Sequence, residues 1–199
     1  MDKNISKRKN FIQIIKILIV ILIQIGVLFM PVKMVIFSRP TFEMLNTEIE
    51  QAIKENSKKY QIDEALIKAI IKVESERFPF AFRYEPHLKN AKWYRKLLTK
   101  QEQTNWWCYC SYGVMQILYG IAKSEGFKGK PEELQKPGNS IEYGVRYLKT
   151  LIKRYYYLED VVSAYNQGTN AKDEKGRFKN QKYVNKVLKY YRKYKKEVI

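Results

Sequence analysis

The chain has 199 residues, of which 45% are hydrophobic and 14% aromatic, so it is too apolar to be disordered and long enough for one domain with attached segments. Lys and Arg number 38 against 20 Asp and Glu, which gives a net charge of +18. This charge predicts attraction to an anionic partner, such as nucleic acid, phospholipid or an acidic cell-wall polymer, without choosing among them.

The first segment of the chain is basic and the second is apolar. Residues 1–10 carry a cluster of Lys and Arg, and residues 11–37 contain an apolar run of about 20 residues, the length that crosses a bilayer. Basic residues before such a run favour a cytosolic N-terminus. We therefore predict a cytosolic segment at 1–10 and a transmembrane signal anchor at 11–37, with the rest of the chain in the periplasm or extracytoplasmic space. A cleaved signal peptide is the alternative, although no A-x-A-like pair follows the run.

Residues 38–60 are predicted to form a helix that connects the anchor to the domain. The stretch 41–60 is amphipathic, and its apolar side should dock on the domain. The apolar positions are Met44, Leu45, Ile49 and Ile53.

Residues 63–76 predict a helix with a carboxylate in its apolar stripe. Asp63 is a suitable N-cap, and Glu74 follows Ile70 by four residues and Ile71 by three, so it lies on the apolar side. Burial raises the pKa of a glutamate toward neutrality, as a general acid requires. The alternative is a glutamate at a helix end whose side chain turns out to water.

The middle of the chain predicts loops rich in aromatic residues. Pro79 should end the preceding helix, and the following aromatic residues could stack on sugar rings or pack within the loop. Residues 91–103 resemble a short basic helix. Cys108 and Cys110 are too close for an ordinary disulfide, and the presence of one histidine makes a zinc site implausible, so we expect no metal or cofactor.

Four further helices are expected. The stretch SYGVMQI, residues 111–117, should begin a helix through Gly113, with the Gln116 amide able to bind a sugar. A longer helix should be capped by Asn139 or Ser140 and reach Tyr155.

The third of these helices, residues 159–166, should be closed by Gly168, which leaves Tyr165 and Asn166 facing a cleft. The C-terminal segment, residues 173–199, should form a polar loop and a basic helix that packs on the core. Tyr183 is one of the residues of this helix available to pack on the core.

Three stretches in this order carry a family resemblance: VES at 73–75, SYGVMQI at 111–117 and AYNQG at 164–168. Together with NSIEYGVRYLKTLIKRY and YVNKVLKYY, they resemble the SLT-type lytic transglycosylases of the lysozyme-like superfamily. The resemblance covers residues 60–192, and we place the core of the domain at 61–172. The sequence departs from the usual family pattern at Gln167, in the loop after Glu74 and in the WWCYC run.

The resemblance implies a mainly α, lysozyme-like domain with a groove for peptidoglycan glycan strands. It implies cleavage of the bond between N-acetylmuramic acid and N-acetylglucosamine without water, leaving a 1,6-anhydro end. Glu74 would be the catalytic acid. The other implied site residues are Ser75, Ser111, Met115, Gln116, Tyr165 and Asn166. Of these, Ser75 would hold the site, Met115 would line the groove and Gln116 would contact substrate.

The residues are compatible with a mechanism that uses one carboxyl group. Glu76 points away from the apolar stripe, so this helix supplies no second acid of the kind that glycoside hydrolases use. Glu74 would protonate the glycosidic oxygen and then, as carboxylate, take the proton from the 6-hydroxyl of muramic acid. A Tyr165 hydroxyl directed at Glu74 would orient it.

Other functions compete with this one. A goose-type lysozyme-like hydrolase would use Glu85 or Glu102 as a second acid, and a non-catalytic module would bind peptidoglycan without cleaving it. The charge also motivates a nucleic-acid binder, which an export anchor disfavours. We expect a monomer at the inner membrane, with peptidoglycan and not nucleic acid as its partner.

Overall fold

The structure is a computed structural model, and it describes residues 41–197. The predicted cytosolic segment 1–10 and the predicted anchor 11–37 lie outside the described residues. Within residues 41–197, no helix combines the length and the apolar content needed to span a membrane.

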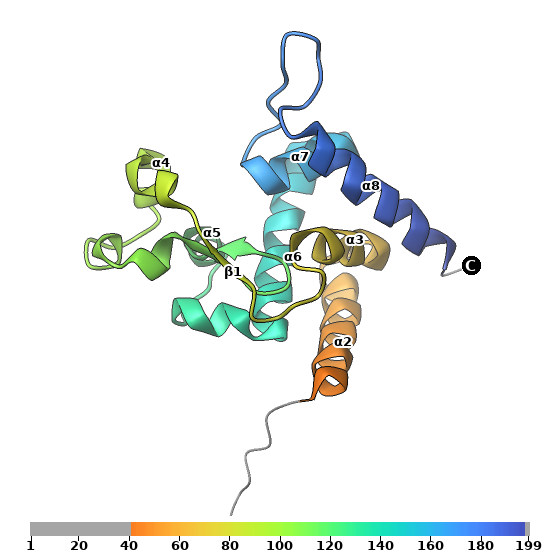
Figure 1. Cartoon of the computed structure of the whole chain (residues 1–199), viewed down its shortest axis with the longest axis horizontal. Helices are drawn as coiled ribbons and strands as arrows, with labels where there is room; N and C mark the ends of the chain where they lie inside the picture. The colour runs from red at the N-terminus through yellow and green to blue at the C-terminus, as the bar shows by residue number, and fades with distance from the viewer. Residues whose placement is uncertain (1–40, 198–199) are drawn as a thin grey trace, which may run out of the picture. The chain divides into compact units, whose positions relative to one another are not determined.

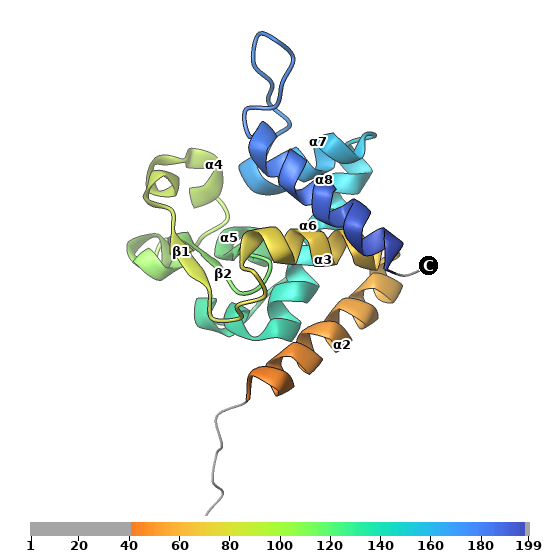
Figure 2. The same cartoon turned by 45° about the vertical axis from the view of Figure 1, so that its right-hand side comes forward.

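Five longer helices form a helical layer, in agreement with the mainly α prediction (Figures 1 and 2). In this layer α3 packs against α8, and α2 packs against α6. Buried aliphatic side chains from all five helices make one continuous core, which surrounds α3. The helices are α2 (Phe42–Tyr60), α3 (Glu64–Glu74), α6 (Pro137–Arg154), α7 (Leu158–Gln167) and α8 (Gln181–Lys196).

The helix expected at 41–60 is α2. Its N-cap, Thr41, accepts a hydrogen bond from the Met44 amide through its hydroxyl. Ile49 and Ile53 are wholly buried, whereas Met44 is 59% exposed because it lies in the first turn of the helix, beyond the core.

A second layer contains a small sheet that we had not predicted. Its strands are β1 (Phe82–Tyr84), β2 (Cys110–Tyr112) and β3 (Ile117–Leu118), antiparallel and in the order β1-β2-β3. The sheet and the short helices around it share a separate core, rich in tyrosine. These short helices are η1 (Pro86–Asn90), α4 (Lys92–Arg95), η2 (Glu102–Thr104), η3 (Trp106–Tyr109), α5 (Tyr119–Ser124) and η4 (Pro131–Gln135).

The prediction that SYGVMQI begins a helix was wrong, because this stretch is a hairpin. Residues up to Tyr112 form β2, and β3 begins at Ile117. Gly113 adopts φ +68°, and a Cβ there would lie 2.4 Å from the Leu134 carbonyl oxygen. Gln116 also has a positive φ of 46°. This turn cannot continue into a helix.

Two predicted helix ends also shifted. Asp63 caps α3 as expected, but the helix ends at Glu74 and not at Glu76, because Glu76 and Arg77 adopt positive φ values of 53° and 75°. Consequently, Glu74 is the last residue of the helix.

The helix α6 begins at Pro137, which has no amide hydrogen and so suits a first helical position. Asn139 and Ser140 lie inside the helix and do not cap it. The buried Ser140 hydroxyl instead joins the two layers by accepting a hydrogen bond from the Met115 amide at 3.1 Å.

Candidate active site

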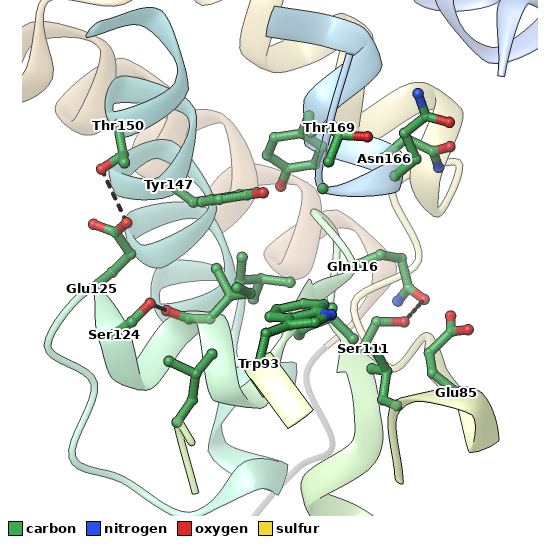
Figure 3. A pocket seen from close by; sticks show the side chains of 18 of the residues that line it. Glu85, Trp93, Ser111, Gln116, Ser124, Glu125, Tyr147, Thr150, Asn166 and Thr169 are labelled. Atoms are coloured by element: carbon green, nitrogen blue, oxygen red, sulfur yellow. Dashed lines mark hydrogen bonds between the residues drawn. The ribbon is translucent and has the colours of Figure 1, made fainter. Parts of the chain in front are cut away.

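A cavity of about 560 Å³ lies where the helical layer meets the sheet layer. Figure 3 shows Asn166 and Thr169 on one side of it, Gln116 and Ser111 on another, Trp93 below and Tyr147 on the side of α6. The predicted residues that line it are Glu74, Ser111, Gln116, Tyr165 and Asn166.

Glu74 is positioned by its place at the end of α3 and by a tyrosine of α8. The Tyr183 hydroxyl donates a hydrogen bond of 2.6 Å to Glu74 Oε1. Tyr183 belongs to the first turn of α8, which packs along α3. The contact joins residues 109 positions apart in the chain.

The environment of Glu74 raises the pKa of its carboxyl to about 7. Burial is the largest cause, because it penalises the charged form. The hydrogen bond from Tyr183 and the charge of Arg83 lower the pKa, and the nearby Glu85 raises it. Near neutral pH this carboxyl can therefore both donate and accept a proton.

The predicted contact between Tyr165 and Glu74 was wrong. The Tyr165 hydroxyl donates instead to the Met115 carbonyl oxygen at 2.9 Å. Its ring lines the cavity and lies 5.6 Å, centroid to centroid, from that of Tyr147. Tyr165 thus holds the hairpin against α7, and the hydroxyl that contacts Glu74 is that of Tyr183.

Gln116 lines the cavity in a fixed orientation. Its amide nitrogen donates to the carbonyl oxygens of Ala81 and Gly113, at 3.1 and 3.0 Å. Its amide oxygen accepts a hydrogen bond of 3.0 Å from the Ser111 hydroxyl. Because both amide protons are used inside the protein, the group that remains available to a ligand is the acceptor oxygen. The almost fully buried Ser111 side chain orients Gln116.

Two of the predicted residues, Met115 and Ser75, do not line the cavity. The Met115 side chain has no exposed surface and packs where a Cβ on Gly144 would meet it, so the prediction that it lines the groove was wrong. The Ser75 hydroxyl donates to the Val114 carbonyl oxygen at 2.8 Å. This bond ties the end of α3 to the hairpin, which is a positioning contact.

Asn166 lies at the end of α7, where Gly168 closes the helix in the left-handed conformation with φ 78°. Its side chain is exposed, and the residue belongs to the lining of the cavity. The Asn166 Oδ1 atom accepts a hydrogen bond of 3.0 Å from Asn180.

The two alternative acids differ in their location. Glu85 lines the cavity, and its side chain is 17% exposed and paired with Arg83 at 2.5 Å. Glu102 lies away from the cavity and is paired with Lys123 at 2.5 Å. Although its burial opposes ionisation, hydrogen bonds from Lys123 and neighbouring groups lower the pKa of Glu102 to about 2. Of these two acids, Glu85 is the one that lines the same cavity as Glu74.

The described chain offers no obvious metal site, since residues 41–197 contain no group of three or more His, Cys, Asp or Glu side chains arranged to hold a metal ion. Cys108 and Cys110 are both buried free thiols. Burial raises the pKa of the Cys108 thiol to about 11.

The chain matches the transglycosylase SLT domain family over residues 51–188, and it belongs to this family. The matched region begins inside α2, before the predicted start of the core at residue 61. Our boundaries for the core and the C-terminal segment remain predictions.

One protein of similar sequence is the membrane-bound lytic murein transglycosylase E of Buchnera aphidicola subsp. Acyrthosiphon pisum (strain APS). The two proteins are 29% identical over 133 residues, which cover 60% of this chain and 49% of the relative. The chain thus spans about half the length of this curated relative.

Proposed function

We propose that this chain is a peptidoglycan lytic transglycosylase with Glu74 as its catalytic residue. The observation that carries the proposal is one carboxyl with a pKa of about 7, hydrogen-bonded to Tyr183 and facing a cavity, in a member of the SLT family. The relative named as a murein transglycosylase supports the same activity. The substrate would be the bond between N-acetylmuramic acid and N-acetylglucosamine.

In the proposed reaction Glu74 serves twice. Protonated Glu74 donates its proton to the glycosidic oxygen, and the bond to C1 of the muramic acid breaks as positive charge develops there. The neighbouring acetamido group stabilises this charge. The Glu74 carboxylate then takes the proton of the 6-hydroxyl, whose oxygen bonds to C1 and closes the 1,6-anhydro ring. A pKa near 7 suits a group that must lose and regain a proton in each cycle.

The other residues of the cavity would bind and orient. Tyr183 would hold the Glu74 carboxyl in place in both of its protonation states, because a phenol can donate to a carboxylate or accept from the acid. The Gln116 oxygen would accept a hydrogen bond from a sugar hydroxyl or amide, and Asn166 would contact the sugar from the opposite wall.

We also propose that residues 11–37 anchor the protein in the inner membrane, with the SLT domain in the periplasm or extracytoplasmic space. The proposal comes from the apolar run and the basic residues before it. The name of the relative, a membrane-bound protein, agrees with it.

A second candidate is hydrolysis on the same fold, favoured by one observation. Glu85 lines the same cavity and is close enough to raise the pKa of Glu74. A second carboxylate could activate water, as in glycoside hydrolases. Its ion pair with Arg83 opposes this role, because Arg83 already occupies Glu85 Oε1.

Mass analysis of the products from purified sacculi tests the two candidates. A lytic transglycosylase releases muropeptides with 1,6-anhydro ends, whereas a hydrolase releases reducing ends heavier by one water. Anhydro products from the wild-type protein are the expected result. Reducing ends alone, lost in a Glu85→Gln variant, would establish the hydrolase instead.

A further inference from the structure

Four exposed aromatic side chains make a continuous surface, which we call the aromatic ridge: Phe82, Tyr84, Trp106 and Trp107. The two tryptophans stack with ring centroids 4.1 Å apart. Phe82 lies 5.5 Å from Trp107, and Tyr84 lies 5.8 Å from Trp106. Each ring keeps between 37% and 49% of its residue surface exposed. Exposed apolar surface of this kind marks an interaction site more often than scattered single residues do.

The ridge is rigid because buried groups hold it from below. Trp107 stacks on Tyr112, which is wholly buried in the second core. The Tyr112 hydroxyl donates to the Trp107 carbonyl oxygen at 2.6 Å, and the Asn105 side chain accepts from the Trp107 amide at 3.1 Å. A surface that is already ordered loses little conformational entropy when it binds.

The ridge is separate from the candidate active site, although both use β1. Successive side chains of a strand point to opposite sides. Arg83 lines the cavity, so its neighbours Phe82 and Tyr84 lie on the other side of the strand. Neither they nor the two ridge tryptophans belong to the lining of the cavity.

We propose that the aromatic ridge binds the sugar rings of a second stretch of glycan, outside the catalytic cavity. This inference rests on the proposed function, since it takes the polymer cleaved in the cavity as the ligand. Flat aromatic rings offer an apolar face that matches the apolar face of a pyranose, and the edges of Trp and Tyr add polar groups for sugar hydroxyls. Lys89, 5.6 Å from the Tyr84 ring centroid, adds a positive charge suited to a polymer that carries carboxylates.

The two surfaces on β1 would act together on one polymer mesh. Binding at the ridge would keep the enzyme on the sacculus between cleavage events, because a tethered cavity meets the next bond at a high effective concentration. Short soluble fragments cannot reach both surfaces and would gain nothing from the ridge. The ridge should therefore matter for sacculi and not for fragments.

The test is binding of the full chain to purified sacculi, in detergent and in a Glu74→Gln background so that the polymer stays intact. We expect Trp106→Leu/Trp107→Leu to weaken binding about tenfold or more. A second variant from the strand, Phe82→Leu/Tyr84→Leu, should do the same if the double tryptophan variant folds poorly. The matched control is Phe42→Ala, which removes a side chain that is 75% exposed on α2.

A fluorescence measurement separates glycan from other partners. The chain has three tryptophans, so Trp93→Phe leaves only the two ridge tryptophans as reporters. Solubilised glycan strands should change their emission, whereas brominated lipids around the reconstituted full chain should not quench it. Strong quenching by lipid would put the ridge at the bilayer and overturn the proposal.

The proposal also fails if both ridge variants bind sacculi as tightly as the control. That outcome is distinct from failure of the proposed function, which would appear as turnover of sacculi by Glu74→Gln itself.

Discussion

The two layers of this domain are stabilised in different ways. The helical layer is held by aliphatic side chains at helical spacing, such as Ile67, Ile70 and Leu148, which have no exposed surface. The sheet layer depends on tyrosines that bind the main chain: the Tyr94 hydroxyl donates to the Cys108 carbonyl oxygen at 2.7 Å and accepts from the Gly120 amide at 2.9 Å. Hydrophobic burial tolerates small shifts, whereas such hydrogen bonds require one geometry.

The candidate site combines a residue from each layer and depends on how they meet. Glu74 comes from the helical layer, and Gln116 comes from the sheet layer. The hydroxyls of Ser75, Ser140 and Tyr165 all bond to the main chain of residues 114–115, between the two. Disturbing this junction should therefore affect both stability and activity.

The largest expected effect on stability comes from the turn at this junction. Gly113→Ala would place a Cβ at a positive φ and 2.4 Å from the Leu134 carbonyl oxygen, so the backbone must move. We expect a loss of about 2–5 kcal/mol in the free energy of unfolding, measured by urea denaturation.

The matched control for this variant is Gly176→Ala. Gly176 has a similar φ of 74°, but a Cβ there would meet nothing within 4 Å. Gly176→Ala should lower the free energy of unfolding by only about 1–2 kcal/mol, the cost of a positive φ alone. Equal losses at the two positions would show that the junction is not tightly packed.

The buried Glu74 carboxyl should lower the free energy of unfolding when it ionises near neutral pH. Its folded pKa of about 7 exceeds the ordinary 4.5, so the stability that the protonated form provides is lost as the pH rises from about 4.5 to 7. Glu74→Gln does not titrate there. We compare the free energy of unfolding of the variant with that of the wild type at pH 4 and at pH 8, by denaturation. The difference should shift in favour of the variant by up to about 3 kcal/mol from the lower pH to the higher. A difference that is the same at both pH values would contradict the raised pKa.

A smaller effect is expected from the tyrosine that contacts Glu74. The hydrogen bond from Tyr183 lowers the pKa of Glu74, so Tyr183→Phe should raise that pKa further. The alkaline limb of the activity profile should then move up by about one pH unit.

The control for this variant is Tyr191→Phe, whose hydroxyl donates to Asp63 at the other end of α3. It should leave the pH profile in place. A profile that moved as far in this control would exclude a specific role for Tyr183.

The difference between the layers also explains what the sequence could predict. The helices α3, α6, α7 and α8 follow from apolar spacing, and Asp63 and Gly168 marked the start of α3 and the end of α7. The start of α6 at Pro137 was missed. The burial of Glu74 followed from its place in one apolar stripe. The β2–β3 hairpin could not be predicted from the sequence. Its strands are too short to show an alternating pattern, and its turn depends on the packing of Gly113 against Leu134.

The partner of Glu74 was missed for a related reason. Tyr183 lies 109 residues after Glu74 in the chain. A tyrosine on the apolar face of a helix is expected to pack in the core, so no local feature indicated the contact. Tyr165 belongs to the AYNQG stretch that resembles the family, so the contact with Glu74 was predicted for it. Its hydroxyl instead donates to the Met115 carbonyl oxygen. Contacts between distant side chains are fixed by packing, which no local pattern encodes.

The central claim is that Glu74 performs the chemistry, and turnover of purified sacculi by Glu74→Gln tests it most directly. The matched control is Glu76→Gln, which removes an exposed carboxylate two residues further on and outside the cavity. We expect release of anhydro-muropeptides to fall by about 10²–10⁴-fold in the first variant and to stay near the wild-type rate in the second. Near-normal release by a folded Glu74→Gln protein would contradict the claim.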